Sequence, residues 1–145
     1  MVQGTRAHTL AMYVVFESPL QMLADSPSEY EREAESMEFM RSVPTVWDET
    51  RALAGEAGGY VLLARRRGAE WFVGAMTNGT ARTLTLDLSF LGAGSYRMDA
   101  WVDGVNADRN GTDYRRESRS VTAADKVELK LAPGGGFAAR IRRGQ

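Results

Sequence analysis

Cysteine is absent from the sequence, and histidine occurs once, as His8. Without cysteine the chain forms no disulfide and has no thiolate nucleophile, and a single histidine leaves too few ligands for a usual zinc site. A serine–histidine–aspartate triad would need His8, yet no serine lies in the sharp turn that presents such a nucleophile. We therefore interpret His8, which borders an apolar run, as a packing or hydrogen-bonding residue.

Long hydrophobic runs are lacking too. The longest, Leu10–Phe16, is too short to cross a bilayer. It is also a poor signal-peptide core, because Glu17 follows it directly and no small-residue cleavage site comes after it. If the protein is exported, its signal is expected to lie outside this sequence.

Net charge is small, −1 over 145 residues, but it is unevenly distributed. Residues 1–58 hold 4 basic and 10 acidic residues, whereas residues 59–145 hold 14 basic and 9 acidic residues. The basic residues alternate along expected strands, which favours a solvated face over a nucleic-acid interface.

Two helices are expected at the start of the chain. The first, Gly4–Ala24, includes an apolar run that covers every side of a helical wheel, which is typical of a helix buried all round. A thin sheet in a domain of this size would not easily bury it, so the chain is expected to be part of something larger. The second helix, Glu29–Arg41, begins after Ser28 as an N-cap, with Glu31 completing a capping box.

After Pro44 the pattern changes to short β signals separated by turn residues. The hairpin of Tyr60–Ala64 and Trp71–Met76 is expected to be buried on most of both faces and to form the centre of the sheet. The polar segment Arg115–Val121 is expected at an edge. The predicted fold is mainly β, an eight-stranded antiparallel sandwich of Greek-key type. Its strands are Thr45–Leu53, Tyr60–Ala64, Trp71–Met76, Thr83–Leu88, Ser95–Asp103, Arg115–Val121, Lys126–Leu131 and Phe137–Arg142.

Two patterns that resemble catalytic or phosphate sites have simpler explanations. Asp48 and Glu49 are adjacent, so on a strand they point to opposite faces and cannot act as a carboxylate pair. The glycines of Pro133–Gly136 lie between two strands, whereas a phosphate loop precedes a helix, so a tight β connection is expected.

The segment Asn106–Glu117 has the oxygen-ligand spacing of a calcium loop, with Gly111 at the sharp turn. Against calcium, position one is Asn rather than Asp, Asp113 stands at a usually apolar position, and strands flank the loop. A long turn uses the same residue types. The turn is the favoured interpretation, and calcium binding is the alternative.

Tryptophans could stack on sugar rings. Trp71 is expected in the core. Trp101 falls on the strand face opposite Tyr96 and Met98, so it is expected either to be exposed, as in a carbohydrate-binding module, or to pack against a neighbouring domain. The second interpretation is favoured.

Several stretches together resemble the C-terminal end of glycoside hydrolase family 97, which contains α-glucosidases and α-galactosidases. They are Gly4–His8, Ala11–Val15, Glu17–Pro27, Val43–Thr50, Asp103–Asp108 and Leu131–Ala139. The resemblance implies an enzyme with an N-terminal β-domain, a central (β/α)8 catalytic barrel and a C-terminal β-sandwich. Residues 1–42 would then be the last helical part of the barrel, and residues 43–145 the sandwich.

This resemblance places the catalytic glutamates and the calcium ligands upstream, on the barrel. No catalytic, cofactor-binding or metal-binding residue is therefore expected in this chain, which would serve as a non-catalytic domain that braces the barrel. The alternative is a carbohydrate-binding module. The expected partner is the barrel, with glycan as a second candidate and neither nucleic acid nor membrane. Self-association through an exposed N-terminal helix and a periplasmic or secreted parent enzyme are also expected.

Overall fold

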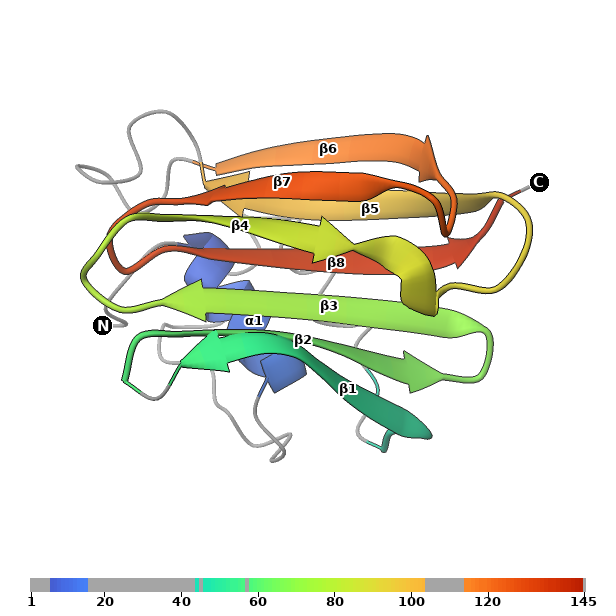
Figure 1. Cartoon of the computed structure of the whole chain (residues 1–145), viewed down its shortest axis with the longest axis horizontal. Helices are drawn as coiled ribbons and strands as arrows, with labels where there is room; N and C mark the ends of the chain where they lie inside the picture. Colours follow the sequence, from blue (N-terminus) through green and yellow to red (C-terminus); the bar gives the residue numbers. More distant parts are fainter. Residues whose placement is uncertain (1–5, 16–43, 45, 57, 104–113, 145) are drawn as a thin grey trace, which may run out of the picture.

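The structure, a computed structural model, describes residues 6–15, 44, 46–56, 58–103 and 114–144. These residues form mainly antiparallel β structure (Figure 1). In chain order the elements are α1 (Arg6–Val15), β1 (Glu49–Glu56), β2 (Tyr60–Arg67), β3 (Glu70–Thr77), β4 (Arg82–Asp87), the 3-10 turn η1 (Leu88–Phe90), β5 (Tyr96–Asp103), β6 (Tyr114–Val121), β7 (Lys126–Leu131) and β8 (Gly136–Arg143). The α-helix among them, α1, is too short to cross a membrane.

The strands form a large sheet of six strands, ordered β1-β2-β3-β8-β5-β6, and a small sheet of two, β4 and β7. The small sheet lies over one face of the large sheet, and α1 lies on the other (Figure 1). We call these the core face and the α1 face. Strand β8 joins the two halves of the large sheet, since it pairs with β3 on one side and β5 on the other.

The predicted hairpin is β2 and β3, reversed at Gly68, whose positive φ of 60° suits glycine. Both of its strands are buried over most of their length, as expected. It does not form the centre of the sheet, however: the central pair is β3 and β8. The polar strand β6 lies at an edge, as predicted.

The main core fills the space between the two sheets. Side chains that alternate along β4 and β7 meet those of β3, β5 and β8, as period-two burial requires. Its buried members include Val73, Leu86, Met98, Leu129, Phe137 and Ile141.

The short connection from β7 to β8 contains Pro133–Gly136, as predicted, and one carboxylate fixes it. Asp103 Oδ2 accepts hydrogen bonds from the backbone N–H groups of Ala132, at 2.9 Å, and Gly136, at 3.2 Å. A Cβ atom at Gly135 would collide with the same oxygen. This aspartate therefore ties the end of β5 to the start of β8.

One prediction about the early chain needs correction, and another is only partly tested. The first strand is Glu49–Glu56 rather than Thr45–Leu53, because it forms where pairing with β2 is available rather than where β propensity is highest. Among the described residues there is one α-helix, α1, and it lies within the predicted helix Gly4–Ala24. The predicted second helix, Glu29–Arg41, and residues 16–24 lie outside the described residues.

Helix α1 buries more of itself against this chain than the sequence suggested. Ala7, Leu10, Ala11 and Val14 form one stripe and are each 0% exposed. The large sheet, unlike the thin sheet we expected, is wide enough to receive that stripe, chiefly at β3 and β8.

Candidate functional site

The α1 face of the large sheet has an apolar half, which α1 covers. Leu10 and Val14 of the helix pack against side chains from four strands, namely Leu63, Phe72, Trp101 and Ala138. The closest approach is at Gly74 of β3. A Cβ atom there would lie 2.9 Å from Val14 Cβ, 3.0 Å from Val15 Cγ2 and 3.1 Å from the backbone oxygen of Ala11. The helix therefore rests directly on bare backbone.

Arg65 anchors the C-terminal end of α1. Its Nη2 donates a hydrogen bond of 3.2 Å to the backbone oxygen of Val15, where a cation complements the helix dipole. The same guanidinium lies 5.7 Å from the ring centroid of Trp47, which in turn meets Phe72 edge-on at 5.4 Å. Polar and aromatic contacts thus add to the apolar packing that holds the helix on the sheet.

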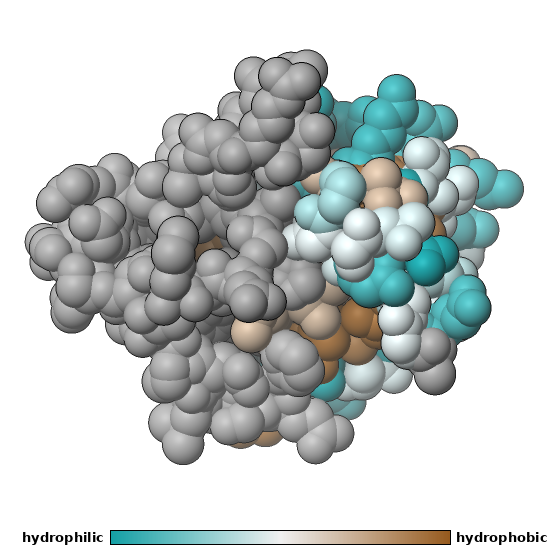
Figure 2. Space-filling view, turned by 90° about the vertical axis from the view of Figure 1, so that its left-hand side faces the viewer, coloured by the Kyte–Doolittle hydropathy of each residue, from teal (hydrophilic) through white to brown (hydrophobic). Residues whose placement is uncertain are grey.

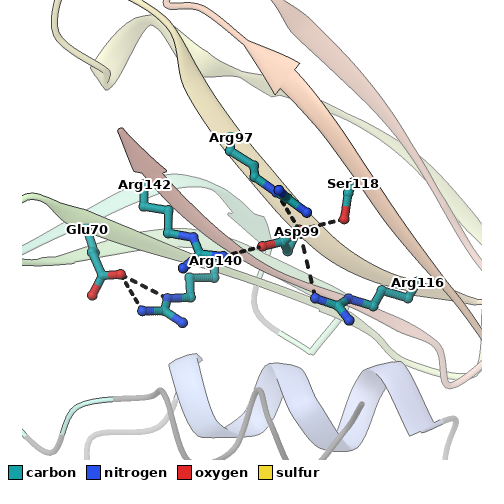
Figure 3. A network of polar contacts seen from close by, with 7 residues as sticks. All are labelled: Glu70, Arg97, Asp99, Arg116, Ser118, Arg140 and Arg142. Atoms are coloured by element: carbon teal, nitrogen blue, oxygen red, sulfur yellow. Dashed lines mark hydrogen bonds and ion pairs between the residues drawn. The ribbon is translucent and has the colours of Figure 1, made fainter. Parts of the chain in front are cut away.

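The other half of the α1 face is charged, and Asp99 of β5 is its centre (Figure 3). Arg97 Nε and Arg142 Nη2 each lie 3.3 Å from the carboxylate, and Arg116 Nη2 lies at 4.0 Å. Ser118 Oγ donates a hydrogen bond of 2.5 Å. The Asp99 side chain is only 3% exposed, so these partners replace its lost water.

The environment of Asp99 favours its ionised form. Burial by itself would raise the pKa of this carboxyl. The Ser118 hydrogen bond and the charges of Arg97 and Arg116 outweigh it, so the pKa lies below its usual value. At neutral pH the site therefore holds one carboxylate among several guanidinium groups.

A second ion pair extends the charged half toward β3. Arg140 of β8 donates to Glu70 Oε1 through Nε at 2.9 Å and through Nη2 at 2.5 Å (Figure 3). Glu70 and Asp99 are thus both engaged with arginine. Because the guanidinium groups outnumber these carboxylates, the charged half is positive.

Trp101 does not offer the exposed ring that a sugar would need. It lies on the predicted strand face, opposite Met98, but is only 2% exposed because α1 covers this part of the face. Arg116 stacks on its ring at 5.3 Å. The favoured interpretation, a packed rather than an exposed Trp101, agrees with this burial, and the element that covers the ring is α1. Trp71, 6% exposed, is in the core as predicted.

The other candidates are not brought together. Asp48 Oδ2 accepts a 2.7 Å hydrogen bond from the backbone N–H of Gly68, and Glu49 pairs with Arg66 at 3.3 Å. Most of Asn106–Glu117, and the side chain of His8, lie outside the described residues. Glu117 lies in β6, 3.0 Å from Arg115. Within the described part of the chain, no group of three potential metal ligands is found.

An apolar hollow of about 520 Å³ lies where β1 and β3 end and β2 begins. Tyr60, Val61 and Met76 line it together with glycines of the β1–β2 connection. Figure 2 shows apolar surface at this end of the molecule, next to hydrophilic side chains. No local pattern in the sequence indicates this hollow, because its residues come from separate strands and from the connections next to them.

A family model described as the glycosyl hydrolase 97 C-terminal domain, with a role in oligomerisation, matches residues 46–142. The chain belongs to glycoside hydrolase family 97. It corresponds to the C-terminal accessory domain of these enzymes, as the resemblance implied.

Similar family members cover almost the whole chain. A retaining α-galactosidase from Bacteroides thetaiotaomicron is 51% identical over 142 residues, 98% of this chain and 22% of the relative. A probable retaining α-galactosidase from Streptomyces bingchenggensis is 35% identical over 92% of this chain and 20% of the relative. The chain therefore spans about a fifth of the length of these curated relatives.

The solved structures agree with this assignment. A family 97 enzyme in complex with acarbose, from Pseudoalteromonas sp. strain K8, superposes with a TM-score of 0.92 at 40% identity, over 99% of this chain and 23% of that chain. A β-arabinopyranosidase gives a TM-score of 0.77 at 33% identity, over 95% and 21%. The fold is thus that of a C-terminal region in much larger glycosidases.

Proposed function

We propose that this chain is a non-catalytic β-sandwich of Greek-key type that braces the catalytic barrel of an α-galactosidase or α-glucosidase. The observation that carries the proposal is the close packing of α1 against the backbone of Gly74. In this proposal residues 1–42 are the end of the barrel and residues 43–145 are the sandwich. Calcium then belongs to the barrel, and the parent enzyme is periplasmic or secreted.

The contact between α1 and the sheet is well suited to bracing. The helix meets β3 at van der Waals distance over backbone, and Arg65 fixes its C-terminal end. Burial of the helix stripe removes apolar surface from water at roughly 25 cal/mol per Å². If α1 is the end of the barrel, this contact fixes the barrel and the sheet relative to each other.

The described carboxylates support a role outside catalysis. Glycosidases need an acid and a base that face one sugar across a cleft. Asp99, Glu70 and Glu49 are instead held in ion pairs with arginine, and Asp103 binds backbone N–H groups. The pKa values of Asp99 and Glu49 lie below their usual values, so these two carboxyl groups are poor general acids.

A chimaera tests the proposal. The purified chain should release no nitrophenol from nitrophenyl α-galactoside or α-glucoside. Replacing the matching fifth of the Bacteroides thetaiotaomicron α-galactosidase with this chain should give an active enzyme, whereas deleting that fifth should not. Turnover by the chain alone that one substitution within it abolishes, or full activity in the deletion, would refute the proposal.

The apolar hollow favours a second role. The family model is described by oligomerisation, and the α1 stripe is already buried on its own sheet. We propose that two copies of the chain associate over the hollow at Tyr60, Val61 and Met76. Sedimentation should show a dimer that Met76→Glu dissociates and that Val46→Glu, a change at an exposed site away from the hollow, leaves intact. A wild-type chain that stays monomeric at high concentration would contradict this role.

A further inference from the structure

A polar hollow of about 600 Å³ lies where β5 begins and β6 and β8 end, at the edge of the charged half of the α1 face. Its lining contains arginine and serine but no carboxylate: Ser95, Arg97, Ser120, Arg142, Arg143 and Gly144. A cavity of this size accommodates a monosaccharide. Its composition points to a ligand that is both hydroxylated and anionic.

The strand register places the two central arginines side by side. Arg97 of β5 is paired with Arg142 of β8 and with Ser120 of β6, so the three side chains form one row on the same face. Arg143 donates from Nη1 to the backbone oxygen of Ala93 at 2.8 Å, which fixes the rim of the hollow. The row is thus set by backbone pairing rather than by flexible loops.

Asp99 orients the two arginines without neutralising them. Its carboxylate accepts one hydrogen bond from Nε of Arg97 and one from Nη2 of Arg142, and it also lies near Arg116. Each guanidinium has five N–H donors in a fixed fork. Arg97 and Arg142 line the hollow and are 55% and 41% exposed, so donors remain accessible there.

We propose that this hollow binds an acidic sugar, with the Arg97–Arg142 pair holding its carboxylate and the serine hydroxyls of the lining contacting its ring hydroxyls. Adjacent guanidinium forks match the planar, bidentate geometry of a carboxylate. The choice of a sugar as the carrier of the carboxylate rests on the proposed function in a glycosidase. The site would retain uronate-bearing glycans beside the enzyme.

Calorimetric titration of the whole chain with glucuronate tests the proposal, with glucose as the neutral counterpart. Saturable glucuronate binding is expected, and it should weaken at least tenfold in Arg97→Gln and in Arg142→Gln. Arg119→Gln, an exposed change on the same sheet that faces the other way, should leave binding unchanged. If a glutamine variant fails to fold, Arg142→Lys, which keeps the charge but loses the fork, serves in its place and should also weaken binding.

Three results would overturn the assignment. They are the absence of saturable glucuronate binding, equal binding of glucose, and equal binding of inorganic sulfate, which would indicate a site for any small oxyanion. This outcome is separable from the proposed bracing role. An active chimaera combined with no glucuronate binding would refute the sugar site alone. An inactive chimaera would refute the bracing role.

Discussion

The two faces of the large sheet differ in what completes them. The core face is closed by β4 and β7, whose aliphatic side chains make a dry layer with Val73, Met98 and Ile141. Among the described residues, the α1 face is covered over one half by a helix that comes from the other end of the chain, and its other half is a network of arginines around Asp99. The core face thus contains most of the apolar core, whereas the α1 face carries the features on which the proposed bracing role and the proposed sugar site depend.

Phe137→Ala should give the largest loss of stability, because the Phe137 side chain lies on the core face and is only 2% exposed. We expect a loss of about 3 to 5 kcal/mol in the free energy of unfolding, from lost burial and the cavity left behind. Urea denaturation followed by tryptophan fluorescence measures it. Val46→Ala, at a side chain 60% exposed, is the control and should change little. Equal losses of unfolding free energy in the two variants would contradict the assignment of Phe137 to the core.

Gly74→Ala tests the apolar half of the α1 face. The new methyl would meet Val14 and the Ala11 carbonyl, so the helix must move or the sheet must bend, at about 1 to 3 kcal/mol. We expect faster hydrogen exchange in residues 6–15 with little change in β4 and β7.

Gly79→Ala is the matched change, since nothing lies within 4 Å of a Cβ atom at that position. If hydrogen exchange in α1 rises equally in both variants, close packing of the helix against Gly74 is not what holds it on the sheet.

Asp99→Asn tests the charged half and should have the smallest effect, about 1 to 2 kcal/mol at pH 7, because the surrounding arginines are partly exposed. The folded-state pKa of Asp99 is lowered, so its ionised form stabilises the fold above the unfolded value of about 3.9. That contribution is lost as the pH falls through the folded pKa.

The difference in unfolding free energy between the wild type and Asp99→Asn should accordingly be full at pH 7 and shrink below about pH 4. Parallel urea titrations at several pH values measure it. A difference that grows on acidification would contradict the lowered pKa.

The sequence predicted the strands from β2 to β8 well, because alternation of apolar and polar residues directly reflects a strand with one buried face. It failed at β1, where Ala52, Ala54 and Gly55 have little β propensity and the pairing with β2 decides the structure. For Trp101 it gave the correct face and favoured a packed ring, but left exposure open as the alternative. Periodicity tells which way a side chain points, but not whether a distant helix covers it.

The Asp99 network could not be found from local patterns. Arg97 and Asp99 lie two residues apart and hint at a charged strand face, yet Arg116, Ser118 and Arg142 join them only through pairing with β6 and β8. The same limit applies to the helix seat, since Gly74 is an ordinary small residue in a strand until α1 is placed upon it.

The position of β8 has a consequence for how the domain is made. Strand β8 is the last strand in the described sequence, yet it lies between β3 and β5 in the middle of the large sheet. During synthesis the β1–β3 and β5–β6 units emerge before β8 and remain unjoined, with open edges, until β8 leaves the ribosome. Assembly of the large sheet is therefore expected to be slow, because the pairing of the two units has to wait for β8 to insert between β3 and β5.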